Sequence, residues 1–196
     1  MKVVVICEDF RKDQYIAKPL VEAMLGALRI RPTVIVAKEP MLRGVMEVLD
    51  WPKLMRVIDR YRGMAQLFLL LVDRDGNEKR RNKLDEIEKA ASKHLGPNVT
   101  FLSENAWQEI EVWALAAQPL PAGWSWSTIR AEINPKERYF IPLVERRELT
   151  EEPAGGWRTM GLEAAKAYKR VRMLCKEDVA RLEQRIQQHL PLRSGS

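Results

Sequence analysis

The chain has 196 residues, a formal net charge of +6, 46% hydrophobic residues and 31% charged residues. This length fits one domain, or one domain with an extension, and the composition excludes a disordered chain. The basic balance is compatible with a polyanionic partner but does not require one. The two cysteines, Cys7 and Cys175, exclude a cysteine-rich zinc site and favour a reducing compartment. The sequence predicts no signal peptide and no membrane span, so a cytoplasmic location is expected.

The first half of the chain alternates apolar runs with amphipathic segments, which is typical of an α/β fold. The predicted strands are residues 2–7, 33–36, 67–72 and 98–102. The predicted helices are residues 15–28, 41–49, 53–60 and 77–94, with Trp51 and Pro52 as a break between the second and the third. A strand–helix–strand unit of this length requires a parallel pair. The pattern therefore predicts a Rossmann-like, mainly parallel four-stranded sheet flanked by helices.

The composition changes after Gln118. Residues 105–117 are predicted to form a helix, and the prolines, glycines and tryptophans that follow predict a loop-rich linker. Residues 161–190 carry an apolar stripe with helical spacing, which predicts one or two helices. We therefore expect an α/β domain at residues 1–118, and a linker with a helical C-terminal extension packed on it at residues 119–196.

Acidic residues follow two of the predicted strands. Residues 67–72 are continuously apolar, as expected for a strand buried on both faces of a parallel sheet, and Asp73 and Asp75 come next. Glu8 follows the first strand, which can lie beside the third, and open α/β sheets bind ligands at the carboxyl ends of their strands. Side chains two residues apart in a strand point the same way, so Asp73 and Asp75 are expected to converge. Three crowded carboxylates repel one another unless a cation joins them, and Mg²⁺ prefers such oxygen ligands.

Other interpretations of these acids stay open. Residues 73–76 could form a surface turn, and Glu8 with Asp9 a helix cap, because aspartate and glycine are common in turns. A phospho-acceptor receiver domain also has an acidic pair after its first strand and an aspartate after its third. A phosphatase of the haloacid-dehalogenase type uses Asp-x-Asp, although after its first strand. An EF-hand loop starting at Asp73 is excluded because the glycine and glutamate that it requires are missing.

The order of these motifs resembles the Toprim domain of topoisomerases, primases and OLD-type nucleases. It is more similar still to the small RloB-like Toprim proteins found among bacterial defence genes. The segments that carry the resemblance are residues 5–8, 13–16, 71–76, 110–113, 133–136 and 174–177. Two departures are Asp9, where a small residue is usual, and the acidic residue Asp13, which lies one position late in the next helix. They leave open whether a site of this kind is active or degenerate.

The resemblance implies a nuclease that depends on Mg²⁺ (or Mn²⁺), hydrolyses phosphodiester bonds of DNA or RNA, and serves in anti-phage defence. Glu8 would be the general acid/base, and Asp73 and Asp75 would hold the metal against the scissile phosphate. Glu111 matches an acidic position of the narrower family and would be an outer metal ligand, or else a solvated helix residue. The implied catalytic residues are therefore Glu8, Asp73 and Asp75, and the implied metal ligands are these three with Glu111.

The resemblance also implies partners. Basic residues after the third strand would hold phosphates of a nucleic acid, or else form an ordinary charged helix face. They are Arg74, Lys79, Arg80, Arg81 and Lys83. Related systems place such a subunit beside an ATPase, and the alternative to a nuclease is an inactive Toprim-fold subunit that binds nucleic acid or that ATPase without cutting. The sequence does not determine the oligomeric state, for which a homodimer is one arrangement.

Overall fold

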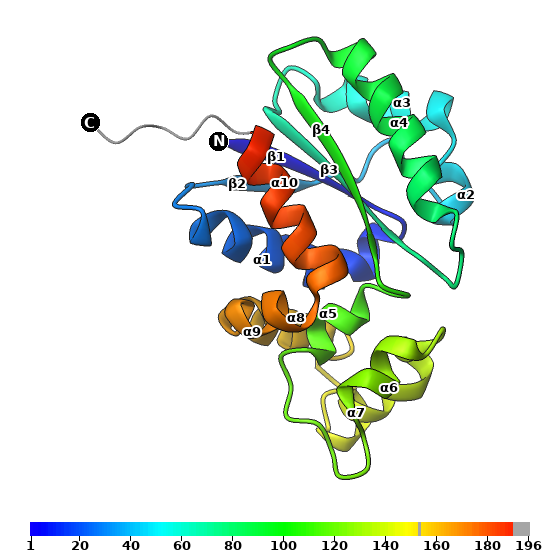
Figure 1. The fold of residues 1–196 in the computed structure, drawn as a ribbon, viewed down its shortest axis with the longest axis vertical. Helices are drawn as coiled ribbons and strands as arrows, with labels where there is room; N and C mark the ends of the chain where they lie inside the picture. Colours follow the sequence, from blue (N-terminus) through cyan, green and yellow to red (C-terminus); the bar gives the residue numbers. More distant parts are fainter. Residues whose placement is uncertain (153, 190–196) are drawn as a thin grey trace.

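The computed structural model describes residues 1–152 and 154–189. Four strands form an all-parallel sheet in the order β2-β1-β3-β4, which confirms the predicted α/β class (Figure 1). The strands are β1 (Lys2–Cys7), β2 (Thr33–Val36), β3 (Leu67–Asp73) and β4 (Thr100–Ala106). The first and third strands are neighbours, with Val3 paired to Leu67 and Cys7 to Leu71.

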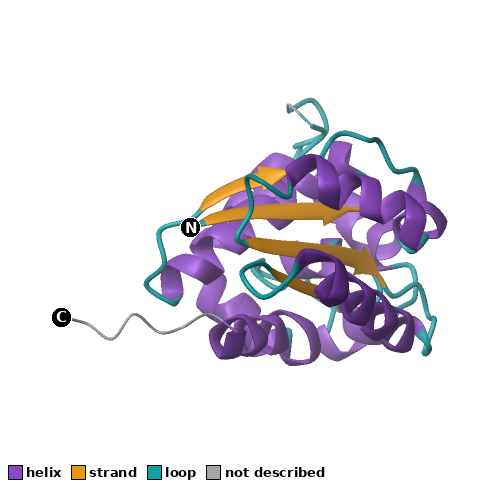
Figure 2. Cartoon of the chain, turned by 90° about the horizontal axis from the view of Figure 1, so that it is seen from above, coloured by secondary structure: helices purple, strands orange, loops and turns teal. Residues whose placement is uncertain are grey.

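Helices cover both faces of the sheet, as Figure 2 shows from above. The α-helices are α1 (Phe10–Ala27), α2 (Gly44–Val48), α3 (Trp51–Tyr61), α4 (Arg80–Leu95), α5 (Glu111–Leu115), α6 (Trp126–Ala131), α7 (Ile141–Arg146), α8 (Trp157–Lys166), α9 (Tyr168–Leu174) and α10 (Arg181–His189). Two π-helical segments, η1 (Lys136–Phe140) and η2 (Lys176–Ala180), precede α7 and α10. None of the helices within the described residues is both long and apolar enough to cross a membrane.

Alternating side chains of the strands feed two separate apolar cores. Val3 and Val5 pack with α1, α5 and the C-terminal helices, whereas Val4 and Ile6 pack with α3 and α4. This alternation follows from the period of two in a strand, and it explains why β1 and β3 are apolar at nearly every position. The sheet is therefore the middle layer of three, and its loops at the carboxyl ends of the strands carry the polar groups.

Several predicted boundaries were wrong. Trp51 and Pro52 begin α3 instead of breaking a helix, because Asp50 accepts a hydrogen bond from the Lys53 backbone N–H (3.0 Å) and proline is tolerated in the first turn. The predicted helix at residues 105–117 is mostly not helical, since β4 runs to Ala106 and only α5 remains of it.

The second half of the chain is also more helical than predicted. The region after Gln118 contains α6, η1 and α7, and Ser125 caps α6 by accepting from the Thr128 backbone N–H (3.1 Å). Residues 161–190 were predicted as one or two helices, but they include most of α8, then α9, η2 and α10. Residue 190 lies outside the described residues.

The C-terminal helices pack directly on the α/β layers. Helix α8 lies against α1, and α10 lies beside β4 (Figure 1). The core on the α1 face contains Trp113 from the first predicted part of the chain, and Phe140, Trp157 and Leu182 from the second. The predicted domain boundary near residue 118 stays a prediction.

Candidate metal centre

Glu8 and Asp73 meet where β1 and β3 end. Glu8 follows the last residue of β1, and Asp73 is the last residue of β3. The Asp73 backbone N–H donates a hydrogen bond to Glu8 Oε1 at 2.8 Å. The pairing of these two strands therefore places two of the predicted catalytic carboxyl groups together at one edge of the sheet.

Asp75 reaches the same place by a different route from the one predicted. It lies beyond the end of β3 in the left-handed region (φ +50°), so the period of two of a strand does not apply. The backbone N–H groups of Arg74 and Asp75 both donate to the carbonyl oxygen of Gln108, at 2.7 and 3.1 Å. The Gln108 side chain accepts from the Gly76 N–H at 2.8 Å. A tight turn, fastened to the connection after β4, thus orients Asp75.

Glu109 completes a carboxylate cluster that the sequence analysis missed. Asp73, Asp75 and Glu109 each present an oxygen atom, and these three atoms lie within 4.8 Å of one another. The Ile110 backbone N–H donates to Asp73 Oδ1 (2.8 Å), and the Lys136 N–H donates to Glu109 Oε2 (2.7 Å). The signal that could have found Glu109 was its place just after the fourth strand, which the predicted helix at residues 105–117 concealed.

Glu111 lies behind this cluster. It is 2% exposed, so the interpretation as a solvated helix residue was wrong. Its Oε1 accepts a hydrogen bond from Trp157 Nε1 (3.1 Å) and lies 3.7 Å from Lys136 Nζ. Glu111 and Glu8 both lie outside the three-carboxylate set, and each is held by a hydrogen-bond donor of the protein.

Burial and mutual repulsion raise the pKa of these carboxyl groups. Burial raises the pKa of Glu8 to about 7, against which the hydrogen bond from Asp73 acts. Burial also raises the pKa of Asp13, in the first turn of α1, and of Glu109, each to about 7. Burial first, and then the charges of Glu111 and Glu8, raise the pKa of Asp73 well above its ordinary value. Ionising this cluster therefore costs free energy.

Few positive charges compensate the cluster. Arg80 Nη2 lies 3.4 Å from Asp75 Oδ2, and Lys136 approaches Glu111. The net effect on Lys136 is a raised pKa, so its ammonium group stays charged. Burial alone would lower this pKa, but the carboxylates of Glu111 and Glu109 outweigh the effect of burial. A divalent cation would relieve the remaining repulsion. The donor set is made only of oxygen atoms, which suits a hard cation such as Mg²⁺, Mn²⁺ or Ca²⁺. Asp73, Asp75 and Glu109 could therefore bind a metal ion.

The predicted basic residues fall into three groups. Arg74 lies over the Trp107 ring at 4.0 Å, and Arg80 is 8% exposed beside Asp75. Arg81 instead pairs with Asp85 and Glu88 and donates to the Ser103 carbonyl oxygen, so it ties α4 to β4.

The two lysines are exposed. Lys83 lies 3.3 Å from Glu86, one turn along α4, and Lys79 stands just before that helix. The structure therefore brings Arg80 to Asp75 of the carboxylate cluster, places Arg74 over Trp107, and leaves the lysines on the outer surface.

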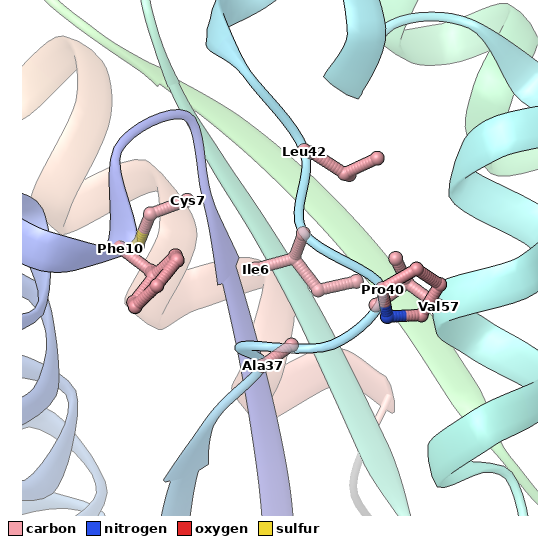
Figure 3. Close-up of a pocket in the computed structure, with 7 residues that line it drawn as sticks. All are labelled: Ile6, Cys7, Phe10, Ala37, Pro40, Leu42 and Val57. Carbon is pink, nitrogen blue, oxygen red and sulfur yellow. The ribbon is translucent and has the colours of Figure 1, made fainter.

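An apolar recess lies beside the end of β1 (Figure 3). Its volume is about 10 Å³, which is room for about one water molecule. Ile6, Pro40 and Val57 point into it from three segments of the chain. It offers no charged side chain and is too small for an organic ligand.

No protein-family model matches the chain, and neither does any curated protein or solved structure. The function of the site is therefore inferred from the residues that form it and from their contacts.

Proposed function

We propose that this chain is a metal-dependent nuclease with a Toprim-type site, acting on DNA or RNA with Mg²⁺ or Mn²⁺, as an effector of anti-phage defence. The observation that supports it best is the cluster of Asp73, Asp75 and Glu109 at the carboxyl ends of parallel strands, with oxygen atoms within 4.8 Å. A bound divalent ion at such a cluster supplies charge neutralisation of a phosphate and a more acidic water. The basic side chains beside the cluster favour a phosphate-bearing substrate.

The residues of the chain have distinct parts in this proposal. Asp73, Asp75 and Glu109 would hold the metal. Glu8, whose pKa lies near 7, can accept or release a proton at neutral pH and is placed within hydrogen-bonding reach of the Asp73 backbone. Glu111 accepts from Trp157 and keeps Lys136 near the cluster, so it positions charge without needing to touch the metal.

A second candidate is a non-cutting subunit that binds nucleic acid or a partner ATPase. The Lys136 ammonium group favours it, because this cation already neutralises part of the cluster without a metal. Receiver-like and phosphatase roles for Asp73 are further alternatives, and the receiver-like role predicts covalent labelling of Asp73 by acetyl phosphate. No labelling would exclude that role.

The test separates metal binding from cleavage. Mn²⁺ binding is measured by calorimetry, and cleavage is measured on supercoiled plasmid and on a tRNA transcript, with Mg²⁺ or Mn²⁺ and with EDTA. Asp73→Asn keeps an oxygen acceptor for the Ile110 N–H but removes the charge. Asp59→Asn is the control, because Asp59 is an exposed residue of α3 that pairs with His94 of α4. The nuclease proposal expects Mn²⁺ binding and cleavage to disappear in Asp73→Asn and to persist in Asp59→Asn. Metal binding without cleavage, alone or with a partner ATPase, would favour the non-cutting subunit.

A further inference from the structure

A polar hollow of about 130 Å³ opens beside the carboxylate cluster, between the start of α4, the end of β4 and the start of α10. Four arginines line it, together with Asn105 and Trp107. The arginines are Arg74, Arg80, Arg81 and Arg181. Asp75 links the hollow to the cluster, since its carboxylate contacts Arg80 at 3.4 Å.

Arg80 lines this hollow and carries a buried hydrogen-bond donor that has no acceptor among the described residues. Its side chain is buried at 8% exposure, and its Nε is the buried side-chain nitrogen that finds no partner among the described residues. Its Nη2 contact with Asp75 is long for a charge-assisted hydrogen bond. A buried guanidinium N–H without an acceptor is costly, so an acceptor supplied by a bound ligand would stabilise this arrangement.

The local helix sequence points to the same ligand chemistry. Helix α4 has 16 residues and begins at Arg80, with Lys79 as its N-cap residue and no acidic residue in its first turn. The positive end of a helix dipole favours anions and disfavours cations at these positions. Lys79, Arg80 and Arg81 therefore stand where an isolated helix would prefer carboxylates, and a bound anion would compensate Arg80, since Arg81 already pairs with acidic side chains.

Two of the four arginines are already paired and form the wall of the hollow. Arg81 Nη1 lies 3.6 Å from Glu104, and Arg181 Nε donates to the same fully buried carboxylate at 2.9 Å. Arg74 lies 4.0 Å over the Trp107 ring, and its guanidinium group makes no hydrogen bond or ion pair among the described residues. Glu78 also lines the hollow, but it is exposed and can face solvent. Arg74 and Arg80 are therefore the cations that a ligand would meet.

We propose that this hollow binds a phosphate group of a nucleic acid strand, next to the phosphate that the carboxylate cluster would process. This inference rests on the proposed nuclease function, and it adds the position of the neighbouring part of the nucleic acid strand. Two guanidinium groups and the start of a long helix match the shape and charge of a tetrahedral oxyanion. Free inorganic phosphate shares this chemistry, so the experiment has to distinguish the two sources.

The experiment uses the full chain in EDTA, where neither a metal nor cleavage contributes. Binding of a fluorescent single-stranded oligonucleotide is measured by anisotropy over a range of salt concentrations, and inorganic phosphate is tested in parallel by thermal shift. The variants are Arg80→Gln and Arg74→Gln. Arg56→Gln is the control because it removes the same charge from an exposed position on α3. Circular dichroism checks folding, and Arg74→Gln keeps the test valid if Arg80→Gln does not fold.

Each hollow variant is expected to weaken oligonucleotide binding by roughly tenfold and to reduce the salt dependence by about one phosphate contact. The control should change binding by less than about twofold. Unchanged oligonucleotide binding in folded Arg74→Gln and Arg80→Gln would overturn the proposal. The proposal would also be overturned if these variants lost the thermal shift caused by inorganic phosphate but still bound the oligonucleotide normally. If the variants lost oligonucleotide binding and the wild type cleaved no nucleic acid, the phosphate-binding role of the hollow would be supported and the nuclease function would be refuted.

Discussion

Replacing Glu8 by glutamine should stabilise the metal-free protein, and only at neutral to alkaline pH. Glu8→Gln keeps an oxygen that accepts from the Asp73 N–H, but it removes a carboxylate from a partly buried acidic cluster. The pKa of Glu8 is raised from 4.5 to about 7 in the folded protein, chiefly by burial. The folded state therefore binds more protons than the unfolded state in this window, and stability falls as the pH rises through it.

The size of the effect follows from the same pKa shift. One pKa unit corresponds to about 1.4 kcal/mol, so ionising Glu8 costs the folded protein about 3 kcal/mol near pH 8.5 and less than about 1 kcal/mol near pH 5. The amide oxygen of glutamine accepts a weaker hydrogen bond than a carboxylate, which cancels part of the gain. We therefore expect Glu8→Gln to raise the free energy of unfolding by about 1 to 3 kcal/mol near pH 8.5 and to leave it nearly unchanged near pH 5.

Urea unfolding in EDTA at the two pH values measures this difference, and Glu88→Gln is a control of opposite sign. Burial raises the pKa of Glu88, but hydrogen bonds from Arg185 and Ser103 outweigh it and lower that pKa, so this carboxylate is stabilising when charged. Glu88→Gln should therefore destabilise the protein near pH 8.5. The reasoning is refuted if Glu8→Gln is no more stable than the wild type near pH 8.5, or if its gain is equal at both pH values.

Two further substitutions, Gly161→Ala with Gly26→Ala as its control and Asp178→Asn, test the packing that supports the site. Gly161→Ala should lower the free energy of unfolding by roughly 1 to 3 kcal/mol, because its Cβ would overlap the Tyr15 carbonyl oxygen and lie 2.8 Å from the carbonyl carbon. Gly26→Ala, in α1 with open space around it, should instead be neutral or stabilising by up to about 1 kcal/mol, and equal effects in thermal unfolding would contradict the close approach of α8 to α1. Asp178→Asn should cost about 3 kcal/mol in urea unfolding, since it removes the buried one of the two carboxylates that pair with Arg130 and leaves only the exposed Glu177. A loss below about 0.5 kcal/mol would show that this pair is not needed for stability.

The sheet was predictable because its strands are buried on both faces. Leu67 and the residues after it are apolar without interruption, and in the structure Leu67 to Leu71 are at most 1% exposed. A continuous run of this kind has few alternatives to a central parallel strand once helices flank it. The meeting of Glu8 and Asp73 was predictable for the same reason, since strand adjacency alone brings the two ends together.

The rest of the carboxylate cluster was not predictable from local patterns. Asp75 and Gln108 both adopt positive φ angles (+50° and +74°), which residues other than glycine rarely do. These two conformations are held by hydrogen bonds between segments about thirty residues apart, from Arg74 and Asp75 to Gln108. No sequence period describes such a pair of turns, so only the place of Glu109 just after the fourth strand pointed to this edge of the sheet.

The second half was misjudged because proline and tryptophan were read as loop residues. Tryptophan and tyrosine are packing residues here: Trp124 and Tyr139 meet edge to face with ring centroids 4.9 Å apart. Trp126 donates from Nε1 to the Leu174 carbonyl oxygen (3.3 Å), which joins α6 to the end of α9. These contacts connect distant segments, so composition alone could not reveal the short helices that they hold.

The C-terminal helices also hold the segment that carries Glu109 of the carboxylate cluster. Asp178, with 0% exposure, accepts hydrogen bonds at 2.8 Å from the Trp107 backbone N–H and from Trp113 Nε1. Gln108 and Glu109 lie between these two anchored tryptophans, so a carboxylate near the end of the chain fixes both ends of the connection after β4. The carboxylate cluster therefore depends both on the strand ends and on the contacts of Asp178 with Trp107 and Trp113. An α/β sheet without the last helices would keep Glu8 beside Asp73 but would lose the contacts that hold the tryptophans on either side of Glu109.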